Sequence, residues 1–391
     1  MNKEVLKAVI EKAHDQLITE LCGRKYARNR DAPFERAGTT GRTLVTRHGT
    51  IAFKLAKVRS LENQSILRPL LLDIGMDPWK RIVNDLEFEC AETATYLTYR
   101  DSKTVIENLT KAKVSNHRIH ASVQKVGSFL DKERRETREG TVDLLYADGT
   151  KAHGIDDTKN EINVILGKNV ETGEKHLVGL TVNQPWTATA EQVNNKAAVL
   201  ISDADRELRN ALIDKALDHQ QCVRHAIGDG GYSLWKAGLP KQERKAIRTR
   251  LQAILNTSRN SVLRHLKDQD MERLQWRINE TLADLKQLAK DLAEDGLTAT
   301  AKFIRNAANY LITFARLAIK QVRVPSTNTL IERLMEEIAK RVKNKWMHWS
   351  TTGLENLLTL LLVRYCNKER YNQLKQRYLS QEPTGIHITV T

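Results

Sequence analysis

Three carboxylates stand where the sequence pattern predicts the end of a strand or the start of a helix. Asp148 ends the apolar segment LLYAD, Asp203 ends AAVLISD, and Glu332 lies in the helical segment PSTNTLIERL. Converging carboxylates can hold two divalent cations about 4 Å apart, as two-metal phosphoryl transfer requires. If the two strands are neighbours, Asp148 and Asp203 lie side by side, because adjacent strands are about 4.8 Å apart. The pattern therefore indicates a candidate metal-dependent site.

Each of these carboxylates also has a purely structural interpretation. Asp148 precedes a glycine and can form a turn, and Asp203 can cap the helix that follows it. Thr329-x-x-Glu332 has the spacing of a capping box, in which the glutamate only accepts backbone N–H groups. Spacing alone does not choose among the three glutamates of this segment, which are Glu332, Glu336 and Glu337.

Two further motifs have less specific chemistry. Cys222-x-x-His225, with His219 just before it, suggests zinc, but the other cysteines stand alone and no second Cys/His pair has the spacing of a closed zinc site. The glycine-rich GDGG at 228–231 is predicted to be a flexible turn, and it lacks the Lys-Ser/Thr of a phosphate-binding P-loop. Neither motif specifies a function by itself.

The charge balance indicates a polyanionic partner. The 391 residues include 63 Lys and Arg against 48 Asp and Glu, a net charge of +15. Lys and Arg that neutralise phosphates release condensed counterions, which favours binding to nucleic acid. A basic protein that is merely soluble is the alternative. Part of the excess is concentrated in the segment 236–277.

The composition favours a soluble, cytosolic protein. The longest apolar run, 357–363, is far shorter than the ~18–20 residues of a membrane span. The first 21 residues form an amphipathic helical pattern rather than a signal peptide. The four widely spaced cysteines are expected to be reduced.

The first 140 residues are predicted to contain a basic hairpin and a helix-turn-helix. Alternating apolar residues around His48-Gly49 predict the hairpin, whose edge carries Arg42 and Arg47. Helices over about 102–109 and from a cap at Ser115 form the helix-turn-helix pattern. Its second helix presents Arg118 and Lys125, which can reach bases and phosphates. A solvated edge and an ordinary helix pair are the structural alternatives.

From residue 139 the predicted order is β-β-β-α-β-α-β, a mixed sheet flanked by helices. The expected elements are strands at LLYAD, EINVILG and HLVGLTV, a helix over about 189–196, a strand at AAVLISD, a helix over about 206–219, and a strand at CVRHAI. From residue 241 onward the pattern is almost wholly helical.

Taken in order, these segments resemble an insertion-sequence transposase of the Mutator-like DDE group. LLYADGT resembles the segment of the first catalytic aspartate, LISDADRELRNAL that of the second, and STNTLIERL the helix of the last acidic residue. QQCVRHAI resembles the family's Cys-x-x-His motif, and LPKQERKAI the charged helix after it. The resemblance implies an α/β RNase H-like core interrupted by an all-helical insertion, with a helical N-terminal DNA-binding region.

The resemblance also implies a chemistry. Asp148, Asp203 and Glu332 would hold two Mg²⁺ or Mn²⁺ ions, cut DNA at the element ends and transfer the freed strand. Asp229 of GDGG is a minor rival for the second acidic position. The expected partners are double-stranded DNA and further copies of the chain, with no membrane. The expected location is cytoplasmic and nucleoid-associated.

The expected organisation has six parts: an N-terminal helix and basic hairpin (1–83), a helix-turn-helix-like region (84–138), the first part of the catalytic core (139–257), the helical insertion (258–323), the closing core helices (324–372) and a tail (373–391). Two other functions remain open. One is a non-catalytic DNA-binding protein derived from a transposase, and the other is an RNase H-like nuclease.

Overall fold

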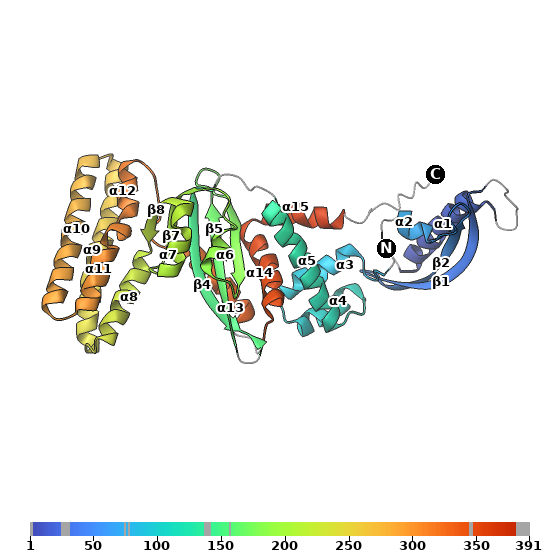
Figure 1. Cartoon of the computed structure of the whole chain (residues 1–391), viewed down its shortest axis with the longest axis horizontal. Coiled ribbons are helices and arrows are strands. Elements are labelled where there is room, and N and C mark those ends of the chain that lie inside the picture. Colours follow the sequence, from blue (N-terminus) through green and yellow to red (C-terminus); the bar gives the residue numbers. More distant parts are fainter. Residues whose placement is uncertain are drawn as a thin grey trace. The chain divides into compact units, whose positions relative to one another are not determined.

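A computed structural model describes the following residues of the chain: 3–24, 32–73, 76, 79–136, 142–155, 158–343 and 347–380. They form two compact units, the first from 1–133 with 352–391 and the second from 134–351. Figure 1 shows helices and strands in both, a mixed α/β composition. None of the helices in the described part of the chain has the length and apolar character needed to traverse a bilayer.

The first unit contains the predicted hairpin. Strands β1 (Phe34–Thr46) and β2 (Gly49–Ser60) pair antiparallel, and Thr46 faces Gly49 across a two-residue loop. Gly49 has φ +106°, a backbone conformation that favours glycine. Both strands run beyond the predicted segment, because helix α1 (Lys3–Cys22) packs on their apolar face. The short elements β3 (Ile66–Leu67) and α2 (Pro69–Asp73) complete this part.

Helices form the rest of the first unit. They are α3 (Asn84–Ala94), α4 (Tyr99–Thr110), α5 (Asn116–Glu136), α14 (Thr351–Cys366) and α15 (Lys368–Leu379), and the unit boundaries fall within α5 and α14. The predicted pair of helices is confirmed as α4 and α5, and the Ser115 hydroxyl accepts a hydrogen bond from the Arg118 N–H. Phe88 of α3 packs against Tyr371 and Tyr378 of α15, which joins segments far apart in the sequence.

The second unit is built on a five-stranded sheet with the order β6-β5-β4-β7-β8. Strands β4 (Leu144–His153), β5 (Lys159–Lys168) and β6 (Lys175–Val182) are antiparallel neighbours. Strands β7 (Ala197–Ser202) and β8 (Ala216–Gln221) extend the sheet in parallel with β4. Helices α6 (Trp186–Ala190) and α7 (Arg206–Leu212) connect the later strands, so the predicted β-β-β-α-β-α-β order is confirmed.

Several predicted boundaries in this sheet are wrong. Strand β4 continues five residues past Asp148, because β5 pairs with it as far as His153. Helix α6 lies over 186–190 rather than 189–196, and α7 stops at Leu212 rather than 219. The final strand is ALDHQQ rather than CVRHAI, because β7 provides a parallel partner for Ala216–Gln221.

Helix α8 (Val223–Lys236) accounts for the remaining differences. It contains both the segment predicted as a strand and the GDGG predicted as a flexible turn. Its buried residues pack into an apolar cluster with helices α9 (Lys241–Asp268) and α11 (Thr298–Leu311), so tertiary packing overrides the low helix propensity of glycine. Cys222 and His225 therefore lie at the start of a helix.

A helical bundle follows α8 within the same unit (Figure 1). It consists of α9 (Lys241–Asp268), α10 (Met271–Glu294), α11 (Thr298–Leu311) and α12 (Thr313–Ile319). Gln220 at the end of β8 is fully buried, and its side chain donates to the carbonyl of Leu311 and accepts from the N–H of Phe314. These bonds attach the bundle to the sheet. The boundary expected at residue 258 falls inside α9.

Candidate active site

The register of β4 and β7 sets the positions of the two aspartates. Leu144 pairs with Val199 and Tyr146 with Ile201, an offset of 55 residues that also separates Asp148 from Asp203. Residues 145 and 147 point into the apolar cluster beneath the sheet, so Asp148 projects to the opposite face. Asp148 lies two residues beyond the last β4–β7 pair and Asp203 directly follows β7, so continuing the register by two residues would bring the two aspartates opposite each other.

Neither aspartate has the structural role that was its alternative. Asp148 lies within β4, and the glycine after it pairs with Asn163 of β5 instead of forming a turn. Helix α7 is capped by Asp205, whose carboxylate accepts from two N–H groups of the first turn. Asp203 accepts a hydrogen bond of 3.1 Å from the Asp205 N–H, which fixes one of its oxygens.

Glu332 comes to the site on helix α13 (Thr329–Val342), which packs against β4. Asn328 precedes this helix, is fully buried, and donates from its side chain to the carbonyl of Ala147. The Asn328 N–H also points at the Cys222 sulfur, 3.3 Å away. No side chain caps α13, so the capping box is not formed and the Glu332 carboxylate accepts from Arg224 instead, at 2.8 Å.

The three carboxylates interact electrostatically. Burial raises the pKa of Asp148 to about 6, and the negative charges of Asp203 and Glu332 contribute to that rise, against the Gly149 N–H and the charge of His225. Burial also raises the pKa of Asp203, while the Asp205 N–H opposes the shift. Both aspartates are thus held where ionisation is unfavourable, a condition that a nearby cation would relieve.

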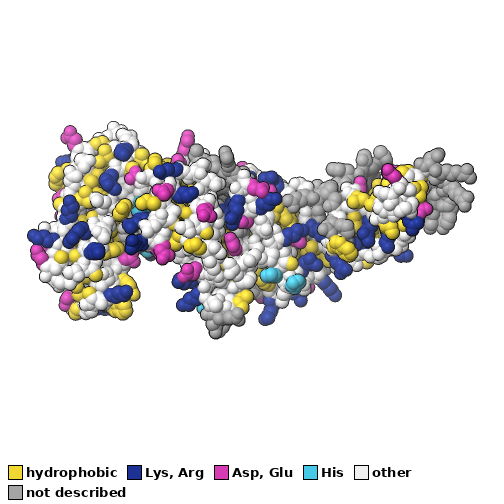
Figure 2. Space-filling model, in the orientation of Figure 1, with side chains coloured by type: hydrophobic (Ala, Val, Ile, Leu, Met, Phe, Trp, Pro, Cys, Tyr) yellow, Lys and Arg dark blue, Asp and Glu magenta, His cyan; other side chains and the backbone are white. Residues whose placement is uncertain are grey.

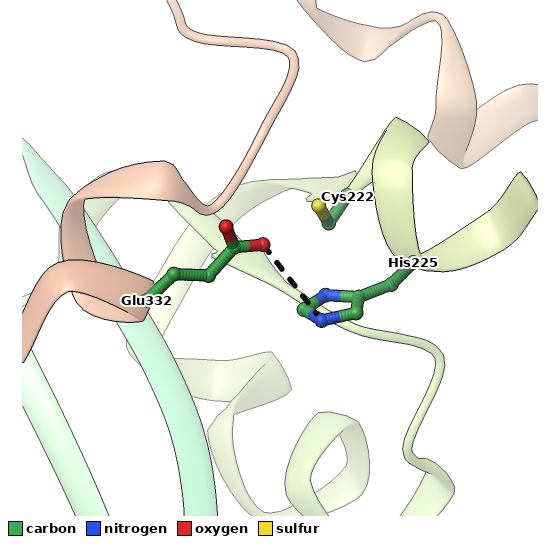
Figure 3. Close-up of side chains that lie close together, drawn as sticks. All are labelled: Cys222, His225 and Glu332. Carbon is green, nitrogen blue, oxygen red and sulfur yellow. Dashed lines mark ion pairs between the residues drawn. The ribbon is translucent and has the colours of Figure 1, made fainter. Parts of the chain in front are cut away.

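Cys222, His225 and Glu332 lie close together (Figure 3). One ligand atom from each lies within 4.8 Å of the others, and the His225 Nε2 is 3.8 Å from the Glu332 Oε1. The pKa of His225 is raised to about 9, first by its hydrogen bond with the Cys222 side chain and further by the charges of Asp148 and Glu332, against the effect of burial. A protonated His225 offsets part of the negative charge of the carboxylates.

The remaining acidic candidates are placed less centrally. Asp229 lies one turn after His225 on α8, and its pKa is raised by burial and by Asp203, whereas His225 lowers it. Glu337 pairs with Lys340 at 2.6 Å, and Glu336 is exposed on α13. Among these side chains, Glu332 is the one in contact with Arg224 and His225.

Three of the four predicted DNA-binding side chains have acceptors within the first unit. Arg42 donates to the carbonyl of Lys80, the Arg47 Nε lies 3.0 Å from Glu89, and the Lys125 ammonium lies 2.9 Å from the buried Glu87. Arg118 on α5 forms no ion pair with any carboxylate of the described residues, and its side chain is half-buried.

The sequence analysis did not single out Arg224 and Asn328 as site residues. Arg224 lies inside Cys-x-x-His and is easily read as one more basic residue, yet it forms the shortest ion pair of Glu332. Asn328 is part of the STNTLIERL segment, and only its contacts with Ala147 and Cys222 reveal that it fixes the start of α13. No spacing rule identifies either role.

Comparison with known proteins gives the family. The family described as Transposase, Mutator family, matches residues 1–371 of the chain. The comparison with curated proteins found no match. Because the family match spans nearly the whole chain, the protein belongs to the Mutator family of transposases.

Proposed function

We propose that this Mutator-family transposase cuts and joins DNA by metal-dependent phosphoryl transfer at an acidic cluster of Asp148, Asp203 and Glu332. The observation that supports the proposal is the 55-residue offset in the register of β4 and β7, which is also the separation of Asp148 from Asp203 in the sequence. The third carboxylate is tied to the same place through Asn328, which bonds to β4 next to Asp148. We further propose that the sheet is an RNase H-like core interrupted by the α9–α12 bundle.

The acidic cluster offers the oxygen ligands of hard divalent cations, although Cys222, His225 and Glu332 form the group of described residues whose ligand atoms lie within 4.8 Å of one another. Carboxylate oxygens are the ligands that Mg²⁺ and Mn²⁺ prefer. The Glu332 Oε1 is buried and accepts no hydrogen bond from the described residues. We therefore assign two such ions to Asp148, Asp203 and Glu332. When bound, these ions supply Lewis-acid polarisation of the phosphate and activate the attacking oxygen.

Residues of the chain position the three carboxylates for this reaction. Asp148 and Asp203 are half-buried, so their charges act more strongly than they would at a fully exposed surface. Arg224 and His225 hold the Glu332 carboxylate in one orientation. Water first attacks a phosphodiester and breaks the bond to the 3′ oxygen. The freed 3′-hydroxyl then attacks a phosphodiester of the target, with one bond formed and one broken in each step.

We assign recognition of the element ends to the first unit. The side chains proposed for DNA contact are Arg118 and Lys125 of α5 and Arg42 and Arg47 of the hairpin. Arg118→Ala should weaken binding to end DNA more than binding to random duplex. Equal loss on both probes would make Arg118 a phosphate contact only. Two ends must be held together, so a homo-oligomer on DNA is expected.

One assay separates the proposed function from its rivals. A supercoiled plasmid carrying the DNA that flanks the gene on both sides is incubated with the protein and Mg²⁺. The proposal predicts end cleavage and strand-transfer products. Binding without products would indicate a non-catalytic DNA-binding protein. Nicking of branched DNA that does not depend on the ends would indicate an RNase H-like nuclease.

A further inference from the structure

Helix α8 contains three glycines in its interior, and each costs about 1 kcal/mol relative to alanine. A Cβ on Gly231 would lie 2.6 Å from the Arg248 side chain, so this glycine makes room for Arg248. A Cβ on Gly230 would make ordinary contacts with Leu251 and Phe303. Gly228 is different, because a Cβ there would meet no heavy atom of the described residues within 4 Å. Packing therefore does not explain Gly228.

Gly228 lines a groove between α8 and α9 that begins beside the acidic cluster. The groove has a volume of about 630 Å³, and its lining includes Asp229 and His225, whose Nε2 is 3.8 Å from the Glu332 carboxylate. Its opposite wall is one face of α9, carrying Arg248, Gln252, Asn256 and Arg259 at helical spacing. Any side chain larger than the hydrogen atom of glycine would project from position 228 into the groove.

The groove suits an anionic ligand. Among the described residues, neither Arg248 nor Arg259 forms an ion pair with a carboxylate, whereas Arg250 on the same helix lies 2.7 Å from Asp291. In Figure 2, Lys and Arg side chains are numerous over the visible face of the α9–α12 bundle. The amides of Gln252 and Asn256 add hydrogen-bond donors and acceptors between the two arginines. The phosphates of a DNA strand lying along this face of α9 would meet Arg248 at one end and Arg259 at the other.

An apolar cavity continues the groove. It has a volume of about 540 Å³ and shares Arg259, Ser326 and Thr327 with the groove. Its lining includes Phe314 and Leu263, and Leu263 is 62% exposed despite being apolar. Its basic lining residues are Lys168, Arg259, Lys267 and Arg323. An apolar floor surrounded by cations fits a base whose neighbouring phosphates remain outside.

We infer that this groove and cavity bind an unpaired DNA strand as it enters or leaves the acidic cluster. Arg248 and Arg259 contact its phosphates, and the apolar cavity takes a base. The inference rests on the proposed function in one respect, because that function is the reason the strand leads to the acidic cluster. Cavities of this size hold a ligand of roughly one or two nucleotides, and an unpaired strand can place a base there without the cost of a few kcal/mol that unstacking and unpairing a duplex base requires.

The test is binding of a short fluorescein-labelled oligothymidine to the full chain in EDTA, followed by fluorescence anisotropy. Arg259→Ala should weaken binding roughly tenfold and reduce the salt slope by about 0.7, as expected for one lost phosphate contact on a single strand. The matched control is Arg264→Ala, an exposed arginine of α9 that lines neither cavity. It should bind like the wild type.

Gly228→Gln separates a binding role from a folding role. Glutamine is a good helix former, so the melting temperature should stay the same or rise while oligothymidine binding falls roughly tenfold. Wild-type affinity and salt slope in both Gly228→Gln and Arg259→Ala would overturn the inference. So would failure of the wild type to bind oligothymidine, or an equal loss of duplex binding in the two variants.

A separate measurement tests whether the apolar cavity binds a base. The wild type should bind oligothymidine more tightly than an abasic oligonucleotide of equal length, and Leu263→Ser should reduce that preference. An unchanged preference would exclude the apolar cavity as the base site. These assays need no catalysis. If the plasmid assay shows no cleavage, the proposed function is refuted, but the oligothymidine measurements still test the groove. If the enzyme is active and the groove variants bind oligothymidine like the wild type, only the groove inference is refuted.

Discussion

The strand pair β4–β7 and the helix α8 meet at the same acidic cluster, but they hold their side chains by different means. Strands β4 and β7 are fixed by their parallel hydrogen bonds and by buried apolar residues on both strands. The positions of the aspartates follow from this fixed backbone. In α8, a helix start bonded to Ser202 and Ser326 places Cys222 and His225, and Gly228 then leaves the side of the helix bare at that position. The backbone of the strand pair is therefore held rigidly, whereas α8 leaves space beside Gly228 that a ligand can enter.

This difference predicts which changes are severe. A substitution in the strand pair should remove chemistry or disturb packing, whereas a substitution on the bare side of α8 should leave the fold intact and alter what the groove admits.

Asp148→Asn should reduce plasmid cleavage in Mg²⁺ by about a thousandfold or more, because an amide cannot replace a charged ligand in the acidic cluster. Binding to end DNA, measured by anisotropy, should remain within about twofold. Glu336→Gln is the matched control, since Glu336 is exposed one turn beyond Glu332. An Asp148→Asn protein that still cuts would remove Asp148 from the site.

Gly167→Ala should destabilise the second unit by about 1–3 kcal/mol. Gly167 lies in β5, where a Cβ would approach Val178 to 2.7 Å and Val142 to 2.9 Å. These β-branched side chains have little freedom to move away. Chemical denaturation measures the effect. Unchanged stability would show that the sheet is less tightly packed than the contacts indicate.

The contribution of Asp148 to the stability of the metal-free protein should decline as pH rises between about 4 and 6. Folding raises the pKa of Asp148 from 3.8 to about 6, so the folded state keeps a proton that the unfolded state has lost in this window. Asp148→Asn should therefore be more stable than the wild type above pH 6, by about 1–3 kcal/mol, and similar near pH 4. Parallel pH profiles for the two proteins would contradict this account.

Gly228→Ala should give the smallest effect, a gain of about 0.5–1 kcal/mol in stability. The position is exposed and no atom opposes the added methyl group. Thermal unfolding beside Gly167→Ala makes the comparison direct, since the same substitution should act in opposite directions in α8 and β5. A loss of stability in Gly228→Ala would mean that the glycine is required by the helix itself.

The sequence analysis was most successful where apolar patterning is strong. Runs such as AAVLISD and EINVILG allow few alternatives to a buried strand, so the order of elements could be predicted. That the strands of Asp148 and Asp203 are neighbours was only a condition of the site hypothesis, and the pairing of β4 with β7 meets it. The helix pair α4–α5 was likewise found from its periodicity and the cap at Ser115.

Prediction was least successful where tertiary packing overrides local preference. VRHAIGDGG contains β-branched residues and glycines, yet contact with α9 and α11 makes it helical. ALDHQQ has little strand character by itself and becomes β8 because β7 pairs with it. Arg224 and Asn328 act through partners more than a hundred residues away, a separation that no local motif encodes.

The most direct test of the proposed acidic cluster compares Asp203→Asn with Asp229→Asn in the plasmid assay with Mg²⁺. Both aspartates lie near His225, but only Asp203 matches Asp148 in the register of β4 and β7. The proposed site predicts that Asp203→Asn gives no cleaved or joined DNA, whereas Asp229→Asn gives both products. Cleavage by Asp203→Asn together with its loss in Asp229→Asn would contradict the assignment.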